Sequence, residues 1–304
     1  MKRRAALELI GATLAAGLAP NTRAAPDFDL TRSELSINLN GRTRTAYVWF
    51  GAARRVSLAL PLVIGFHGGT GNAEGYIGNS RLFAKGEQAG FILACPQGTT
   101  LALPGNYRVW NSGPEYEASS SGAEDVLFTR QLIRTVGSIH PVDAKRVYAT
   151  GFSNGGQMAY RLGLELAGEI AAIAPMSGGR LANGERPSRP VPVRHFHGTA
   201  DSVYPFAGGL GAHSLGRVPH APIPAVIGEW IRFDEASPAP QLQPHDGWEL
   251  RRHEGRAPVD LVLISGMGHQ IAGVGDNGLR AQILKPEPDA VRMALEFFAD
   301  HPLT

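Results

Sequence analysis

The chain has 304 residues, of which 43% are hydrophobic and 18% are charged, and its formal net charge is +2. This composition is typical of a globular protein, and a chain of this length buries a sizeable core without disulfides or metal ions. Acidic and basic residues are interspersed and the basic clusters are short, which argues against a nucleic-acid-binding protein. The single cysteine, Cys95, lies in an apolar run and is expected to be a buried thiol.

Residues 1–24 have the layout of a secretory signal. A basic start precedes an apolar stretch from Leu9 to Ala19, and cleavage is expected after Ala24. The stretch is too short to span a membrane, and the paired arginines near its start also suit twin-arginine export. Glu8 is unusual for a signal, so an amphipathic helix of the folded protein is the alternative. The prediction is an exported protein, periplasmic or extracellular, with residues 25–304 as one catalytic domain and no stable membrane insertion after cleavage.

The first elements after the leader are two strand-like runs around Asn40-Gly41, a strong signal for a β-hairpin. Buried apolar runs of strand length follow within residues 60–71, 91–98, 146–152, 170–179, 191–201 and 259–270, and most of them end in small or polar residues. Segments with helical patterning lie between or after them, at residues 80–90, 121–138, 154–166, 223–236 and 287–301. Pro288-Asp289 favours the start of the last helix.

This alternation of buried strands and helices predicts an α/β fold, with a mostly parallel sheet covered by helices on both faces. No internal repeat or charged linker interrupts it. Two Gly- and Pro-rich stretches, Leu101–Gly122 and Val203–Pro224, are long for simple connections, and we expect them to be binding loops.

Three chemically reactive residue types follow buried strands in the order Ser153, Asp201 and His269. Carboxyl ends of parallel strands meet at one edge of a sheet, so these side chains are expected to lie together. A serine hydroxyl needs a base to take its proton, histidine suits that role near neutral pH, and a carboxylate orients the imidazole. Ser153 lies in a G-x-S-x-G pattern between a strand and a helix, and this order matches the triad order of α/β-hydrolases.

An oxyanion hole is expected beside Ser153. Its donors are predicted to be the backbone N–H groups of Asn154 and of Gly69, in the glycine-rich loop after the first buried strand. Trp110 and Asn111, in the first long loop, are candidates to line the acyl pocket. The alternative for Trp110 is a packing aromatic that anchors this loop.

Other histidines and acids compete with these candidates. His195 and His197 lie near Asp201 in sequence but are interpreted as structural or supporting residues, and His67 is expected to shape its loop through hydrogen bonds. Asp234 falls in a helical segment and is expected to be a surface charge. No metal-binding pattern such as H-E-x-x-H occurs, so neither a metal nor a cofactor is predicted.

Five segments, "PLVIGFHGGTGNAEGY", "RVYATGFSNGGQMAYRL", "APMSGG", "HGTADSVYPFAGG" and "GMGHQ", resemble the exported polyhydroxybutyrate depolymerase and feruloyl/acetylxylan esterase group of α/β-hydrolases. The resemblance spans about residues 60–273 and implies Ser153 as nucleophile, Asp201 as acid and His269 as base. It also implies an oxyanion N–H from the residue after His67-Gly68. Two features depart from the group: its cysteine pairs are missing, and Gln270-Ile271 stand where many relatives have an aromatic residue.

The sequence therefore predicts an exported serine esterase that acts through an acyl-enzyme. Its expected substrates are short hydroxyacyl esters, such as 3-hydroxybutyrate oligomers, or feruloyl and acetyl esters of plant polysaccharide. Two alternatives remain: a serine peptidase on the same fold, and a binding protein that kept the fold without activity.

Overall fold

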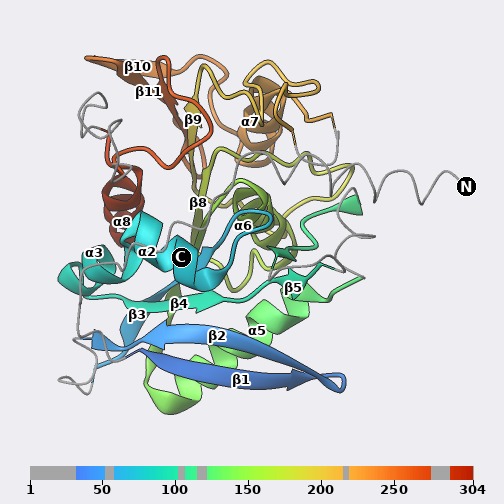
Figure 1. The fold of residues 1–304 in the computed structure, drawn as a ribbon. Helices are drawn as coiled ribbons and strands as arrows, with labels where there is room; N and C mark the ends of the chain where they lie inside the picture. Colours follow the sequence, from blue (N-terminus) through green and yellow to red (C-terminus); the bar gives the residue numbers. More distant parts are fainter. Residues whose placement is uncertain are drawn as a thin grey trace, which may run out of the picture.

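The structure is a computed structural model, and it describes residues 32–51, 58–101, 107–114, 122–214, 219–274 and 288–303. A ten-stranded sheet forms its centre (Figure 1), in the order β1-β2-β4-β3-β7-β8-β9-β12-β11-β10. The strands are β1 (Ser33–Leu39), β2 (Arg42–Trp49), β3 (Leu60–Phe66), β4 (Ile92–Pro96), β7 (Val142–Phe152), β8 (Ala172–Met176), β9 (Val193–Gly198), β10 (Gln241–His245), β11 (Trp248–His253) and β12 (Val259–Ile264). A separate pair joins β5 (Thr99–Thr100) to β6 (Arg108–Val109).

The six central strands, from β4 to β12 in sheet order, pair in parallel, and the strands at both edges pair antiparallel. The predicted hairpin at Asn40-Gly41 joins β1 to β2, with both turn residues at positive φ. The β10–β11 hairpin was not predicted. Its turn contains Asp246-Gly247, a hairpin signal, but every residue of β10 is exposed, so this strand has no apolar face to reveal it.

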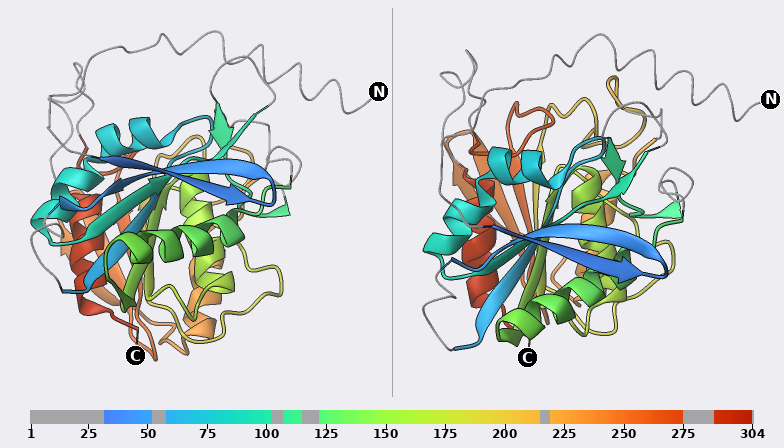
Figure 2. Two further views of the ribbon diagram at one scale, coloured as in Figure 1. Left: turned by 90° about the horizontal axis from the view of Figure 1, so that it is seen from below. Right: turned by 60° about the horizontal axis from the view of Figure 1, so that its bottom comes forward.

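Helices cover both faces of the sheet, as predicted (Figure 2). One face carries α5 (Asp125–Ile139), α6 (Asn154–Glu165) and α7 (Ile223–Phe233), and the other carries α2 (Ala73–Ser80), α3 (Leu82–Gln88) and α8 (Ala290–Asp300). Each face has its own cluster of buried side chains, which includes Phe128 and Trp230 on the first face and Phe83 and Phe298 on the second.

Local capping explains where two helices of the second face, α2 and α8, begin. The Asp289 side chain accepts a hydrogen bond from the Arg292 N–H at the start of α8, in agreement with the predicted start. Asn72 caps α2 in the same way, by accepting from Gly75 N–H. The sequence did not predict α2, because this short helix follows directly on the glycine-rich loop and has a weak apolar pattern.

Asp234, at the end of α7, corrects one expectation. It is fully buried rather than a surface charge, and its Oδ1 accepts a hydrogen bond of 3.0 Å from Val191 N–H. Burial raises the pKa of this carboxyl group to about 8, although the Val191 N–H and Arg189 oppose the shift. Cys95 is buried, as predicted.

The parallel order places the polar residues after β3, β7, β9 and β12 at one edge of the sheet, where ligands of such folds bind. No helix in the described ranges is long and apolar enough to cross a membrane. The predicted leader, residues 1–24, lies outside the described residues.

Candidate active site

Ser153 lies in a sharp turn between β7 and α6. Its backbone has φ 57° and ψ −120°, a conformation that non-glycine residues rarely adopt and that marks functional sites. Its N–H donates a hydrogen bond of 2.8 Å to the carbonyl of Met176 at the end of β8. Side chains are excluded nearby, because a Cβ at Gly151 or Gly155 would overlap the carbonyl oxygen of Phe66. The glycines of the G-x-S-x-G pattern therefore allow α6 to pack closely against β3.

The structure brings the three predicted triad residues together. His269 Nε2 lies 3.0 Å from Ser153 Oγ, and His269 Nδ1 lies 2.8 Å from Asp201 Oδ2. Because an ionised carboxylate only accepts hydrogen bonds, Nδ1 carries the proton of the neutral imidazole. The other nitrogen, Nε2, is then free to accept the proton of the serine hydroxyl.

Asp201 is held by the loop after β9. Its Oδ1 accepts hydrogen bonds from the backbone N–H groups of Val203 (2.9 Å) and Tyr204 (2.7 Å), and its side chain is fully buried. Burial alone would raise the pKa of this carboxyl group, but the hydrogen bonds from His269 and Tyr204 and the neighbouring positive charge outweigh it and lower the pKa. Asp201 is therefore a carboxylate near neutral pH and stabilises a protonated His269.

The imidazole of His269 is 15% exposed and has an aromatic neighbour. The ring of Phe152, half-buried beside Ser153, lies 4.7 Å from it, centroid to centroid. The backbone of the loop before His269 is hydrogen-bonded to the loop that carries Asp201, because Ala200 N–H donates to Met267 C=O at 3.0 Å. His269 is thus positioned by contacts to both the Ser153 and the Asp201 segments.

The two predicted oxyanion donors are neighbours. A Cβ built on Gly69 would lie 3.5 Å from Asn154 Cβ, so the loop after β3 passes directly over the start of α6. Neither Gly69 N–H nor Asn154 N–H donates to a carbonyl of the described backbone. Both are available to a substrate oxygen placed between the loop and Ser153, and the start of a helix favours negative charge there.

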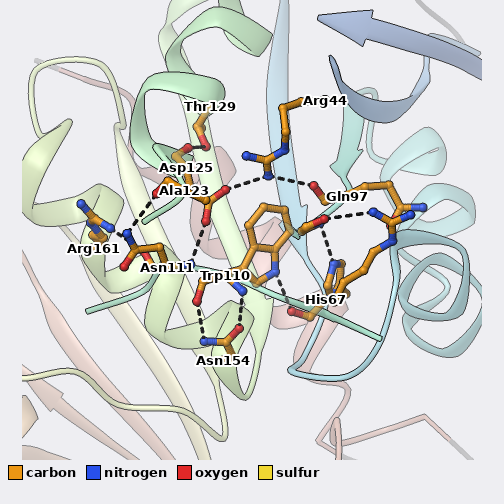
Figure 3. Close-up of polar contacts among 12 residues, drawn as sticks. Arg44, His67, Gln97, Trp110, Asn111, Ala123, Asp125, Thr129, Asn154 and Arg161 are labelled. Atoms are coloured by element: carbon orange, nitrogen blue, oxygen red, sulfur yellow. Dashed lines mark hydrogen bonds and ion pairs between the residues drawn. The ribbon is translucent and has the colours of Figure 1, made fainter. Parts of the chain in front are cut away.

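A hydrogen-bond network joins the predicted oxyanion loop, residues 67–71, to the Trp110 segment (Figure 3). The indole N–H of Trp110 donates to His67 C=O at 2.9 Å, and the Asn154 amide bonds to both the N–H (2.8 Å) and the C=O (3.2 Å) of Trp110. His67 accepts from Gly98 N–H at Nε2 (3.0 Å) and lies 2.8 Å from Gly68 C=O at Nδ1. Burial lowers the pKa of His67 to about 4, so its ring is neutral and shapes the loop, as predicted.

The same network continues to a buried ion pair. Asp125 accepts from Asn111 N–H at Oδ2 and from Arg44 Nη2 at Oδ1, both at 2.7 Å, and its side chain is fully buried (Figure 3). The Asn111 amide donates to Ala123 C=O at 3.0 Å. The sequence did not point to Arg44 or Asp125, which lie 81 residues apart and match no motif.

Trp110 has no exposed surface, so the structure does not place it in the wall of an open pocket. Its ring packs edge-on against Phe66, at 5.1 Å and 81°. This placement fits the alternative given for it, a packing aromatic that anchors its loop, and Asn111 belongs to the same anchor. Within the described ranges, no group of three or more His, Cys, Asp or Glu side chains could hold a metal ion.

Comparisons with known proteins give relatives that are named as esterases. The family model described as esterase PHB depolymerase matches residues 44–203, a segment that contains Ser153 and Asp201, whereas His269 lies beyond it. Feruloyl esterase B of Piromyces equi is 33% identical over 227 residues, which is 69% of this chain and 40% of that protein. The putative esterase NocK of Nocardia uniformis subsp. tsuyamanensis is 33% identical over 60% of this chain and 52% of its own length. The chain thus spans about half or less of these relatives.

Solved structures share the fold at low identity. The acetyl xylan esterase from Aspergillus awamori superposes with a TM-score of 0.59 at 16% identity, over 79% of this chain and 94% of that one. An S-formylglutathione hydrolase from Agrobacterium tumefaciens has a TM-score of 0.58 at 12% identity, over 89% and 95%. These likenesses confirm the predicted α/β-hydrolase fold, and the family match confirms the resemblance on which that prediction depended. The chain belongs to the esterase PHB depolymerase family.

Proposed function

We propose that the protein is an exported serine esterase that hydrolyses carboxylic esters through an acyl-enzyme. The observation that carries the proposal is the continuous chain Ser153 Oγ, His269, Asp201, with contacts of 3.0 and 2.8 Å at the ligand-binding edge of the sheet. The family match and relatives named as feruloyl and acetylxylan esterases support the same chemistry.

Each residue has a defined part in the proposed reaction. Ser153 Oγ attacks the ester carbonyl carbon while His269 Nε2 takes the hydroxyl proton, and Asp201 stabilises the resulting imidazolium. The N–H groups of Gly69 and Asn154 donate to the oxyanion of the tetrahedral intermediate. His269 then protonates the leaving alcohol, and a water molecule activated by the same nitrogen releases the acid and restores Ser153.

We propose short hydroxyacyl esters, such as 3-hydroxybutyrate oligomers, or feruloyl and acetyl esters of plant polysaccharide as the substrates. The first class follows from the family and the second from the names of the relatives. Hydrolysis of p-nitrophenyl acetate, p-nitrophenyl butyrate, methyl ferulate and a 3-hydroxybutyrate trimer would rank these acyl groups by kcat/KM.

The decisive comparison is wild type against Ser153→Ala, with Ser265→Ala as the matched control. Ser265 is an exposed serine just after β12. We expect Ser153→Ala to lose at least about a thousandfold in kcat on every ester, since the nucleophile is removed, and Ser265→Ala to keep wild-type kcat. Equal turnover by wild type and Ser153→Ala would refute the esterase. Turnover of a peptide without any ester would favour a serine peptidase, and substrate binding without turnover would favour a binding protein.

Export is a separate part of the proposal, and it depends on the pattern of residues 1–24. We expect esterase activity in the periplasm or medium of an expressing bacterium. Arg3→Lys with Arg4→Lys should abolish export on the twin-arginine route and leave it intact on the general route. Activity confined to the cytoplasm in the wild type would contradict export.

A further inference from the structure

Two buried histidines outside the triad, His195 and His197, connect the segments that carry the nucleophile and the acid. They lie two residues apart on β9, so both side chains point to the same face of the sheet, and neither has exposed surface. Their rings stack with centroids 5.3 Å apart and an interplanar angle of 14°.

A continuous chain of hydrogen bonds passes through both rings. Tyr160 Oη lies 2.9 Å from His195 Nδ1, His195 Nε2 lies 3.1 Å from His197 Nδ1, and His197 Nε2 lies 2.9 Å from the carbonyl oxygen of Tyr204. All four ring nitrogens therefore have a partner, which removes the cost of burying them unpaired.

Chemistry fixes the direction of this chain. The Tyr204 carbonyl can only accept, so His197 Nε2 carries a proton and donates it. Burial lowers the pKa of both histidines, so each ring is neutral and has one N–H. His197 Nδ1 then accepts from His195 Nε2–H, and His195 Nδ1 accepts from the Tyr160 hydroxyl. Every donor in this chain points from α6, the helix after Ser153, toward the loop that carries Asp201.

The ends of the chain lie in the catalytic segments. Tyr160 is on α6, seven residues after Ser153, and Tyr204 donates its N–H to Asp201 Oδ1 at 2.7 Å. His197 Nε2 also lies 3.7 Å from Asp201 Oδ2, the oxygen that accepts from His269. A parallel connection joins the same two segments, because the Tyr204 hydroxyl and the Gln157 amide of α6 both donate to Gly179 C=O.

We propose that His197, oriented by His195 and Tyr160, is a positioning residue that holds the Asp201 carboxylate in line with His269. The inference rests on the proposed function only for its kinetic readout. Apolar side chains would fill this space without a desolvation cost, whereas a fully paired polar chain specifies one arrangement of the groups that it connects. Here those groups are the helix that presents Ser153 and the loop that presents Asp201.

The test uses two isosteric substitutions at one position. In His197→Gln the amide nitrogen reaches the place of Nε2 and can still donate to Tyr204 C=O. In His197→Asn the amide reaches only the place of Nδ1. It therefore keeps the hydrogen bond with His195 and loses the one with Tyr204 C=O. Each variant loses one buried hydrogen bond, so their losses of thermal stability should be similar. A purely structural role predicts equal activities, and a positioning role predicts unequal ones.

We expect His197→Asn to lower kcat on p-nitrophenyl butyrate by about tenfold or more with KM changed less than about twofold. His197→Gln keeps the donor to Tyr204 C=O but loses the bond to His195, so its kcat should fall only by about two- to fivefold. Tyr160→Phe removes only the far hydroxyl and should lower kcat by a similar factor, roughly two- to fivefold, which tests the chain even where a His197 variant fails to fold. Equal kcat in the two His197 variants, or wild-type kcat in Tyr160→Phe, would overturn the proposal.

A spectroscopic readout separates this inference from the esterase proposal. The proton between His269 Nδ1 and Asp201 should give a far-downfield proton NMR resonance, assigned by its absence in Asp201→Asn. We expect His197→Gln to keep this resonance and His197→Asn to broaden or lose it. That pattern in a protein without esterase activity would refute the function alone. An unchanged resonance in His197→Asn would refute the positioning role whatever the activity.

Discussion

Trp110→Phe tests whether the buried network behind the oxyanion loop supports catalysis. The substitution keeps an aromatic ring but removes the indole N–H that donates to His67 C=O at 2.9 Å. His67 lies two residues before Gly69, one of the two proposed oxyanion donors, so its carbonyl anchors the base of that loop. Leaving a buried carbonyl without this donor costs about 1–3 kcal/mol, in addition to the cost of the smaller ring.

The loss of a complete oxyanion donor typically costs on the order of 10²–10³ in rate, which sets the upper limit for displacing Gly69. We expect kcat/KM of Trp110→Phe on p-nitrophenyl butyrate to fall by about 10- to 100-fold, and the affinity for a trifluoromethyl ketone to fall in parallel. The ketone forms a tetrahedral adduct whose oxyanion needs the same two N–H groups.

Trp230→Phe is the matched control. Trp230 is also almost completely buried and belongs to the cluster that contains Trp110, but it lies on α7 and packs against Tyr160 and Phe233. Urea denaturation should show comparable losses of stability for the two variants, while kcat/KM falls at least about fivefold further in Trp110→Phe than in Trp230→Phe. Activities that fall equally in both variants would refute a specific link between the indole N–H and the oxyanion hole.

Three further predictions concern buried titratable groups. Asp125→Asn leaves Arg44 without its buried carboxylate, so the free energy of unfolding in urea should fall by about 3–5 kcal/mol. The pKa of Asp234 is raised to about 8, so the folded chain keeps a proton that the unfolded chain releases above its ordinary pKa of 3.8. Stability therefore falls as pH rises toward 8, and Asp234→Asn should remove this slope from thermal unfolding, unlike Asp246→Asn at the exposed β10–β11 turn. The pKa of His67 is lowered to about 4, so its contribution is complete above pH 6.5 and is lost as pH falls toward 4. His67→Gln should flatten that acid limb, and an unchanged limb would contradict the assignment of His67 as a buried neutral ring.

The convergence of Ser153, Asp201 and His269 could be predicted because each residue follows a strand whose apolar run is visible in the sequence. Parallel pairing then brings Ser153, Asp201 and His269 to one edge of the sheet. This placement can be predicted without knowing any side-chain contact. The α/β alternation depends on the same local patterns, and the structure confirms it. Periodicity failed where a strand has no buried face, as in β10.

The supporting residues could not be predicted, because their roles depend on contacts between distant segments. Asp234 occupies a helix end that resembles a solvated one, yet its neighbour is Val191, 43 residues away in the sequence. Trp110 lies in a Gly- and Pro-rich stretch, where composition favours an exposed loop, but three hydrogen bonds bind it to His67 and Asn154. Only the folded chain distinguishes an aromatic residue that lines a pocket from one that anchors a loop.

β8 contributes no triad side chain, but its carboxyl end contacts the segment of each member. It lies between β7, which leads to Ser153, and β9, which leads to Asp201. Met176 C=O accepts from Ser153 N–H, and the Ser177 hydroxyl donates to Gln270 C=O beside His269, at 3.3 Å. A Cβ at Gly178 would overlap the Ser153 carbonyl oxygen, so only glycine allows the nucleophile turn to lie this close. The segment after β8, "SGG", therefore sets the spacing between Ser153 and His269, and its sequence is constrained by the backbone of Ser153.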